Sequence, residues 1–157
     1  MTTRRLFFAL WPGEAERDAL WDASAPVREA LGGRPVPRVN LHLTLRFLGE
    51  VTAGEEAAQR DWAASVRWAP IEVTFDRLEW WERPRVLVAT PSVHRICPDI
   101  KSFRPHVTLA REVLPPVDRA RHWPMPSVAW RCERFVLAES RRGAPYSVVG
   151  EWPLYRR

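Results

Sequence analysis

The chain has 157 residues, of which 46% are hydrophobic and 27% charged, and its formal net charge is +5. This length suits one domain with one core, and the apolar content excludes an intrinsically disordered chain. The positive charge comes almost wholly from arginine, since Lys101 is the only lysine. Arginine binds phosphate bidentately and stacks on bases, so the charge favours an anionic partner such as a nucleic acid, although GC-rich coding would produce the same excess.

The first half of the chain predicts two strands and two helices. In chain order they are a strand at 6–11, a helix at 14–31, a strand at 41–48 and a helix from Thr52 to before Pro70. The first helix has apolar residues at helical spacing up to Gly32-Gly33, where it should end. The second should begin at Thr52, because Thr52 and Glu55 have the spacing of a capping box.

The second half predicts mainly strands, expected at 71–75, 85–90, 103–110, 128–138 and 146–149. Two short helices and about seven strands, several of them adjacent in sequence, indicate an α+β fold with antiparallel sheet rather than a doubly wound fold. Residues 91–105 hold three prolines and should form a loop. The sequence has no glycine-rich loop of the dinucleotide-binding or P-loop type.

A short tetrad occurs twice, as His42-Leu43-Thr44-Leu45 and as His106-Val107-Thr108-Leu109. Both copies should lie within strands, the first in the middle of its strand. Alternate side chains of a strand share a face, so each copy should present a histidine and a threonine to one side and its apolar residues to the core. The two strands together would offer two imidazoles and two hydroxyls to one cleft, with one copy from each half of a pseudo-symmetric fold.

The repetition argues against coincidence. The chain has 4 His and 7 Thr, and two of the four histidines carry a threonine two residues later. The chance of this is roughly 1 per cent, before the flanking leucines are considered. A single such motif is more simply a half-buried strand with a hydrogen-bonded histidine, but two copies favour phosphate chemistry.

The remaining composition points away from metals and membranes. Cys97 and Cys132 match neither a metal-ligand spacing nor a disulfide framework, so we expect reduced thiols in a cytoplasmic protein. The apolar run at 6–11 is too short for a secretory signal or a membrane span. Catalytic zinc normally has three protein ligands, and neither tetrad has a nearby carboxylate or cysteine as the third, so we expect no metal.

Three segments carry a resemblance to a known family: residues 5–10, 41–51 and 104–111, the latter two containing the tetrads. In these segments the chain resembles the RNA 2',3'-cyclic phosphodiesterases historically called 2'-5' RNA ligases, members of the two-histidine (2H) phosphoesterase superfamily. The resemblance implies a bilobal α+β fold, in which two antiparallel sheets with outer helices flank a central cleft. Residues 1–157 would form one 2H phosphoesterase domain of two pseudo-symmetric lobes. Family members usually carry a helix where this chain has only 91–105.

The resemblance also implies an activity, the metal-independent hydrolysis of RNA or nucleotide 2',3'-cyclic phosphate ends by a monomer that needs no cofactor. Such a reaction needs a base and an acid, and histidine can serve as either near neutral pH. The resemblance implies that His106 is the base that activates water and His42 the acid that protonates the leaving O3', so that a 2'-phosphomonoester forms. Thr44 and Thr108 would bind the phosphate oxygens, the alternative being β-branched residues that merely favour a strand.

Two further residues are candidate substrate ligands. Arg111 should lie near the end of its strand and contact phosphate or base, with a solvated surface arginine as the alternative. Phe47 is a candidate to stack on the terminal base, with a core phenylalanine as the alternative. Trp80-Trp81 and Trp123 are candidates to line an RNA path, although core or edge packing explains them more simply.

The other histidines, His94 and His122, lack a threonine two residues later and are expected to be structural or exposed. Three alternatives to the hydrolase stay open. The same groups would support the reverse reaction, the 2'-5' ligation of RNA halves. A non-catalytic RNA-binding module of the same fold is a second alternative, and a purely structural α+β domain is a third.

Overall fold

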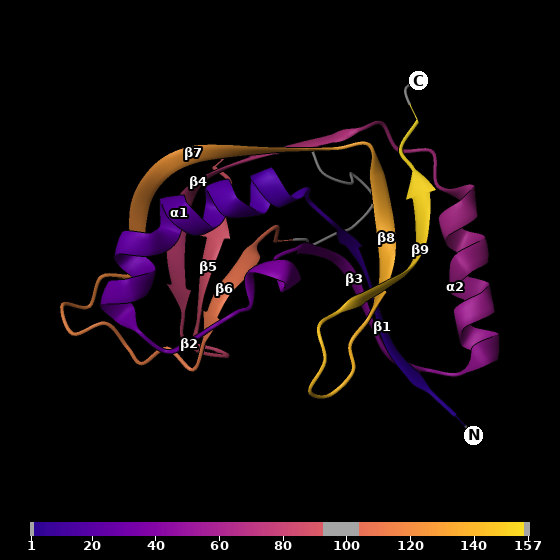
Figure 1. Ribbon diagram of the computed structural model, residues 1–157, viewed down its shortest axis with the longest axis horizontal. Helices are drawn as coiled ribbons and strands as arrows, with labels where there is room; N and C mark the ends of the chain where they lie inside the picture. The colour runs from indigo at the N-terminus through magenta and orange to yellow at the C-terminus, as the bar shows by residue number, and fades with distance from the viewer. Residues whose placement is uncertain (1, 93–103, 156–157) are drawn as a thin grey trace.

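The computed structural model describes residues 2–92 and 104–155. Over these residues two α-helices accompany one large sheet whose strand pairs are all antiparallel, which confirms the α+β class (Figure 1). The elements in chain order are β1 (Arg4–Leu10), α1 (Glu14–Leu31), β2 (Arg34–Pro35), the 3-10 helix η1 (Arg38–Asn40), β3 (Leu43–Val51), α2 (Ala53–Ser65), β4 (Ile71–Trp81), β5 (Val86–Thr90), β6 (Val107–Arg111), β7 (His122–Cys132), β8 (Arg134–Glu139) and β9 (Ser147–Pro153).

The sheet has two halves, joined in the middle, of which the first has the short strand β2 in addition to four longer strands. The strand order is β7-β4-β5-β6-β3-β1-β8-β9, with β2 paired to β6. The central strands β3 and β6 pair only through Leu43 and Val107. The two expected sheets are therefore linked at this single residue pair into one continuous sheet. A long-range pairing of this kind leaves no local pattern in the sequence.

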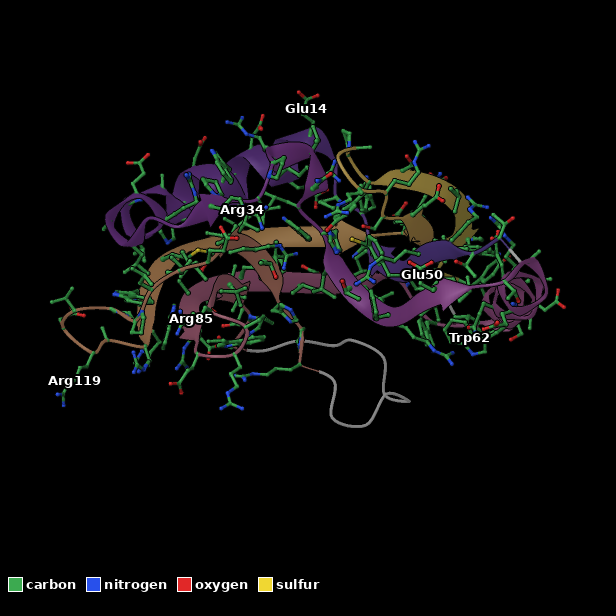
Figure 2. All side chains as sticks on the ribbon, turned by 90° about the horizontal axis from the view of Figure 1, so that it is seen from below. Glu14, Arg34, Glu50, Trp62, Arg85 and Arg119 are labelled. Carbon is green, nitrogen blue, oxygen red and sulfur yellow. The ribbon has the colours of Figure 1, made fainter. Side chains whose placement is uncertain are left out.

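Each half is covered by one helix (Figure 1). Helix α1 lies against β7, where the indole nitrogen of Trp130 donates to the Glu16 carbonyl at 3.3 Å. Seen from below, α1 spans one face of the sheet and Glu14 points away from it (Figure 2). Helix α2 packs on the other half through Trp62, whose ring lies 5.2 Å from that of Phe8. Its start is as expected, because the Glu55 backbone N–H donates to the Thr52 hydroxyl at 3.2 Å.

From Leu6 to Leu10, strand β1 is buried on both faces, which explains the uninterrupted apolar sequence of this part. Leu6, Phe8 and Leu10 belong to the main hydrophobic core. The alternate residues Phe7 and Ala9 form a second, smaller cluster with Val136 and Ala138 of β8. This second cluster lies on the side of the sheet that carries the candidate site.

The prediction of a single strand at 128–138 was wrong in its bounds. It is two strands, β7 and β8, that meet at Glu133, and β7 already begins at His122. Two prolines, Pro124 and Pro126, lie within β7. Strand β7 is an edge strand, where a proline without an N–H donor is tolerated. Its partner β4 is correspondingly longer than the expected 71–75 and continues to Trp81.

Residues 93–103 lie outside the described part of the chain, and with them His94, Cys97 and most of the expected loop at 91–105. The described ends of that segment, 91–92 and 104–105, carry neither helix nor strand. Among the described helices, none combines the length and the apolar character that a membrane crossing requires.

Candidate active site

The two tetrads lie at the beginnings of the two central strands. His42 and His106 each directly precede the first residue of their strand, Leu43 of β3 and Val107 of β6. The expectation that the first tetrad lies mid-strand was wrong, because η1 occupies the residues before it. The expected alternation is confirmed: the apolar residues of both tetrads are buried, while the histidines and threonines are only half-buried.

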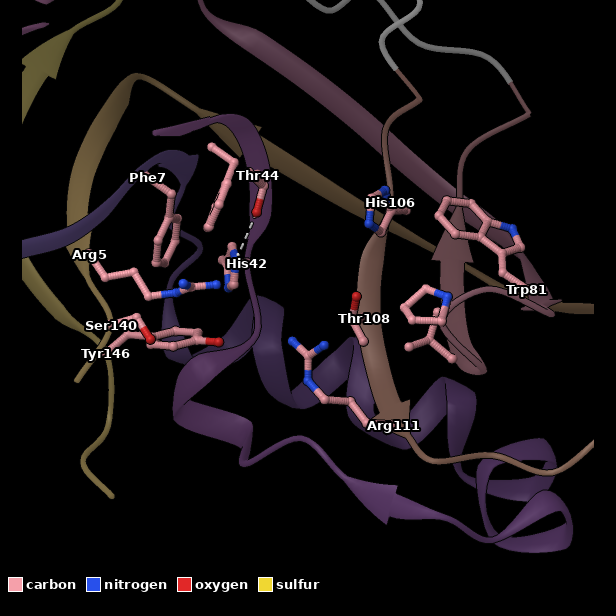
Figure 3. Close-up of a pocket in the computed structure, with 13 residues that line it drawn as sticks. Arg5, Phe7, His42, Thr44, Trp81, His106, Thr108, Arg111, Ser140 and Tyr146 are labelled. Carbon is pink, nitrogen blue, oxygen red and sulfur yellow. Dashed lines mark hydrogen bonds between the residues drawn. The ribbon is translucent and has the colours of Figure 1, made fainter. Parts of the chain in front are cut away.

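The single pair that joins the halves also brings the tetrads together. Because Leu43 and Val107 pair in antiparallel register, Thr44 lies across from His106, and His42 lies across from Thr108. All four side chains are on the face opposite to that of the paired residues. They line one cavity of about 470 Å³ and point into it from two sides (Figure 3).

Both ring nitrogens of His42 have partners. Nδ1 lies 2.7 Å from the Asn40 carbonyl oxygen, and Nε2 lies 3.0 Å from the Thr44 hydroxyl. A carbonyl oxygen can only accept, so Nδ1 carries the proton of the neutral ring and Nε2 accepts from Thr44. The ring is enclosed by aromatic side chains, with Trp11 stacked at 5.6 Å and Tyr146 edge-on at 5.3 Å between ring centroids.

His106 is held in the same way on the other side of the cavity. Its Nδ1 lies 2.8 Å from the carbonyl oxygen of Arg104, so Nδ1 again donates and Nε2 is left with the lone pair. The ring of Trp81 lies 4.6 Å from that of His106. The two histidines are thus matched, each fixed through Nδ1 to the carbonyl of the residue two positions earlier.

The surroundings lower the pKa of both imidazoles and so favour the neutral form. The pKa of His42 is lowered to about 4, mainly by burial. The bond to the Asn40 carbonyl opposes this change, and the charges of Arg111, His106 and Arg17 act in the same direction as burial. Burial also lowers the pKa of His106. The Arg104 carbonyl and the Glu79 carboxylate oppose that change, and the charges of Arg104 and Arg111 reinforce it.

The two candidate substrate ligands both line the cavity. Arg111 is half-buried at the end of β6 and directs its guanidinium between the two tetrads (Figure 3). Gly33, between α1 and β2, approaches Arg111 closely, since a Cβ on Gly33 would lie 2.7 Å from the Arg111 carbonyl oxygen. Phe47 is 58% exposed, so the core alternative was wrong for it. The guanidinium of Arg5 lies 4.9 Å from the Phe47 ring centroid.

The other aromatic and histidine candidates differ in whether they line the cavity. Trp80 is buried and donates to the Val113 carbonyl at 3.0 Å, so it belongs to the core. Trp123 packs against the same core. Trp81 alone of these three lines the cavity. His122 is exposed on β7, as expected.

Six lining residues have no counterpart among the site residues expected from the sequence: Arg5, Phe7, Pro84, Val86, Ser140 and Tyr146. Ser140 and Tyr146 flank a turn between β8 and β9 and come to the cavity only because β8 pairs with β1. The cavity has two arginines, Arg5 and Arg111, and no acidic residue among the described residues that line it. Its charge therefore suits an anion. In the part of the chain that the structure describes, no three His, Cys, Asp or Glu side chains are grouped so as to hold a metal ion.

Comparisons with a family model and with known sequences point to the same family. A family model described as LigT like phosphoesterase matches residues 10–88. An RNA 2',3'-cyclic phosphodiesterase of Escherichia coli is 34% identical, the match covering 69% of this chain and 72% of that protein. An RNA 2',3'-cyclic phosphodiesterase of Thermus thermophilus is 32% identical, over 96% of this chain and 90% of that protein.

Solved structures agree in fold. The structure of E. coli LigT complexed with 3'-AMP superposes with a TM-score of 0.85 at 26% identity, covering 99% of this chain and all of that one. A structure from Thermus thermophilus gives a TM-score of 0.73 at 27% identity, with 96% and 97% of the two chains covered.

Proposed function

The chain belongs to the LigT-like phosphoesterase family, and we propose that it hydrolyses the 2',3'-cyclic phosphate ends of RNA or nucleotides to 2'-phosphomonoesters. The relatives named for this activity match most of the chain. The observation that carries the proposal is the arrangement of His42, Thr44, His106 and Thr108 on one face of the sheet, around a cavity whose lining is basic.

In the proposed reaction His106 is the general base. Its Nδ1 is occupied by the Arg104 carbonyl, so the lone pair of Nε2 is available to a water molecule in the cavity. Because the surroundings keep the ring neutral, this lone pair is free to accept a proton. As the water oxygen bonds to phosphorus, its proton passes to Nε2 of His106.

His42 is the proposed general acid, on the opposite side of the phosphorus. The P–O3' bond breaks as the water attacks, and the proton on Nε2 of His42 passes to O3'. With a pKa of about 4, His42 is neutral near pH 7, so it must take up this proton together with the substrate. The negative phosphate would favour that uptake by offsetting the positive charge of Arg111 beside the ring.

The remaining groups bind the phosphate and the nucleotide. The hydroxyls of Thr44 and Thr108 would donate to the two non-bridging oxygens, on which negative charge accumulates in the transition state. The Thr44 hydroxyl also donates to Nε2 of His42, so a bound phosphate would compete with the ring for this hydroxyl. Arg111 would add its charge from the end of β6, and the exposed ring of Phe47 would stack on the terminal base.

The test is incubation with a ribonucleoside 2',3'-cyclic phosphate and with a short RNA ending in one, in the presence of EDTA. We expect turnover without added metal and a product carrying only the 2'-phosphate. No turnover with any of the four bases would contradict the proposal and leave the RNA-binding module as the better explanation. Full dependence on a divalent ion would overturn the histidine mechanism.

Two variants test the residue roles. His42→Ala and His106→Ala should each reduce kcat by roughly 10²–10⁴-fold, the range typical of a lost general acid or base. Their circular dichroism spectra should match that of the wild type, and His122→Ala provides the control for loss of a histidine outside the cavity. A fully active His42→Ala or His106→Ala would show that the two residues do not act as a pair.

A further inference from the structure

The two histidines depend on backbone carbonyls that lie outside the sheet. The Asn40 carbonyl belongs to the end of η1, and the Arg104 carbonyl to the residues before β6. Neither segment is part of the strand ladder that fixes the threonines. The position of each carbonyl must therefore be set by other contacts, and the side chains of the same two residues supply them.

On the His42 side, the contact is made by the Asn40 side chain itself. Its Oδ1 accepts a hydrogen bond from the Tyr146 backbone N–H at 3.0 Å. Tyr146 directly precedes β9, and its ring is one of the aromatic walls around His42. Asn40 thus fixes the Nδ1 of His42 through its carbonyl and ties down one wall of the same ring through its side chain.

On the His106 side, the contact is made through Glu79 of β4. Arg104 donates from Nη2 to Glu79 Oε1 at 3.0 Å, and its guanidinium lies 4.2 Å from the ring centroid of Trp81. The Glu79 side chain is only 18% exposed, whereas that of Arg104 is 64% exposed. Glu79 is therefore the fixed end of the pair and Arg104 the end that it holds.

Glu79 is itself held in its ionised form. Burial opposes ionisation, but Thr90, Trp81 and the charges of Arg104 and Arg77 outweigh it and lower the pKa of the Glu79 carboxyl. The Thr90 hydroxyl and the indole nitrogen of Trp81 are buried next to Glu79. Neither has a hydrogen-bond partner at standard distance and angle among the described residues. The Glu79 carboxylate thus interacts with several of the side chains that pack beside His106.

We propose that Asn40 and Glu79 are positioning residues, each holding in place the backbone carbonyl that fixes Nδ1 of one histidine. Asn40 does so by tying the end of η1 to Tyr146, and Glu79 does so by holding Arg104 from β4. This inference rests on the proposed function, in which Nε2 of each ring exchanges the proton. A ring released from its carbonyl can place its proton on Nε2, the nitrogen that must accept it in His106. The anchors therefore act on the tautomer and the orientation of the rings and do not touch the substrate.

The test is to observe the imidazole nitrogens of both histidines by ¹⁵N NMR at neutral pH in the wild type and in Asn40→Ala and Glu79→Ala. We expect the wild-type rings to carry their proton on Nδ1. Glu79→Ala should give a mixture of tautomers at His106 alone, and Asn40→Ala a mixture at His42 alone. Each variant should lower kcat by roughly 10–100-fold, the effect typical of a lost outer partner, with KM changed less than twofold.

Conservative variants distinguish the loss of an anchoring hydrogen bond from a change of charge and from a failure to fold. Glu79→Gln keeps an oxygen that can accept from Arg104, and Asn40→Asp keeps one for Tyr146, so both should retain the Nδ1–H tautomer. Glu79→Gln should also lower the pKa of His106, because Glu79 is the acidic group that opposes Arg104 and Arg111 there. If an alanine variant fails to fold, the corresponding conservative variant and the wild type still report the tautomer.

The control variants are Val39→Ala, beside Asn40 in η1 and exposed, and Glu72→Ala, on the same strand as Glu79 but away from the cavity. Neither should change a tautomer or kcat. The inference is overturned if the wild-type rings carry their proton on Nε2, or if folded Asn40→Ala and Glu79→Ala keep both the tautomers and kcat of the wild type. An inactive wild type would contradict the proposed function alone, because the NMR readout needs no turnover.

Discussion

Acidification should destabilise this protein through His42 in particular. Burial lowers the pKa of this imidazole from 6.5 to about 4, so the folded chain binds a proton there less readily than the unfolded chain. The part of the unfolding free energy that depends on a neutral His42 is present in full above pH 6.5 and is lost as the pH falls towards 4. At ~1.4 kcal/mol per pH unit, the difference corresponds to on the order of 3 kcal/mol of unfolding free energy.

The assay is urea denaturation at several pH values between about 7.5 and 4.5, for the wild type and for His42→Gln, which does not titrate. The unfolding free energy of the wild type should fall on acidification by about 2 to 3 kcal/mol more than that of the variant. His122→Gln is the matched control, since it removes a histidine that is exposed on β7. Equal pH dependence in the wild type and in His42→Gln would refute the reasoning, because it would show that burial does not suppress protonation at His42.

Other predictions follow from the same geometry. Inorganic phosphate should raise the pKa of His42, which NMR titration of its ring protons with and without phosphate measures; an unchanged value would argue that the anion binds elsewhere. Thr108→Val should lower kcat by roughly 10²-fold with the fold intact, as for the loss of a donor to transition-state charge, and a wild-type kcat would exclude that role. Leu43→Ala removes a fully buried side chain at the junction of the two half-sheets and should cost about 2 to 5 kcal/mol of unfolding free energy in urea. Phe47→Ala, at an exposed position, should raise KM without loss of stability; an unchanged KM for every base would exclude stacking.

Local patterns in the sequence predicted most elements well. The helix at 14–31 has the expected bounds, and the Thr52 cap begins the second helix as expected. These features depend on neighbouring residues, namely apolar spacing, glycines and a capping side chain. The errors fell where a distant strand or a preceding turn decides the outcome: β7 accepts two prolines because it is an edge strand, and residues 41–42 leave β3 because η1 precedes them.

The paired tetrads were also readable from the sequence, together with the face on which their histidines and threonines lie. The alternation of a strand is local, so buried Leu43 and Val107 imply the opposite direction for His42 and His106. Arg111 could be predicted in the same way, because it is the last residue of β6, the strand that carries the second tetrad.

The sequence by itself therefore determined which four side chains could act together, because their order along each strand sets the face they share. Only the tertiary structure decided that they meet, through the single long-range pair of Leu43 with Val107 that joins β3 to β6. It also decided what surrounds them, since Arg5, Tyr146 and Glu79 come from segments distant in sequence. The pKa of His42 depends on that enclosure, because desolvation arises from everything packed around the ring and not from its neighbours along the chain.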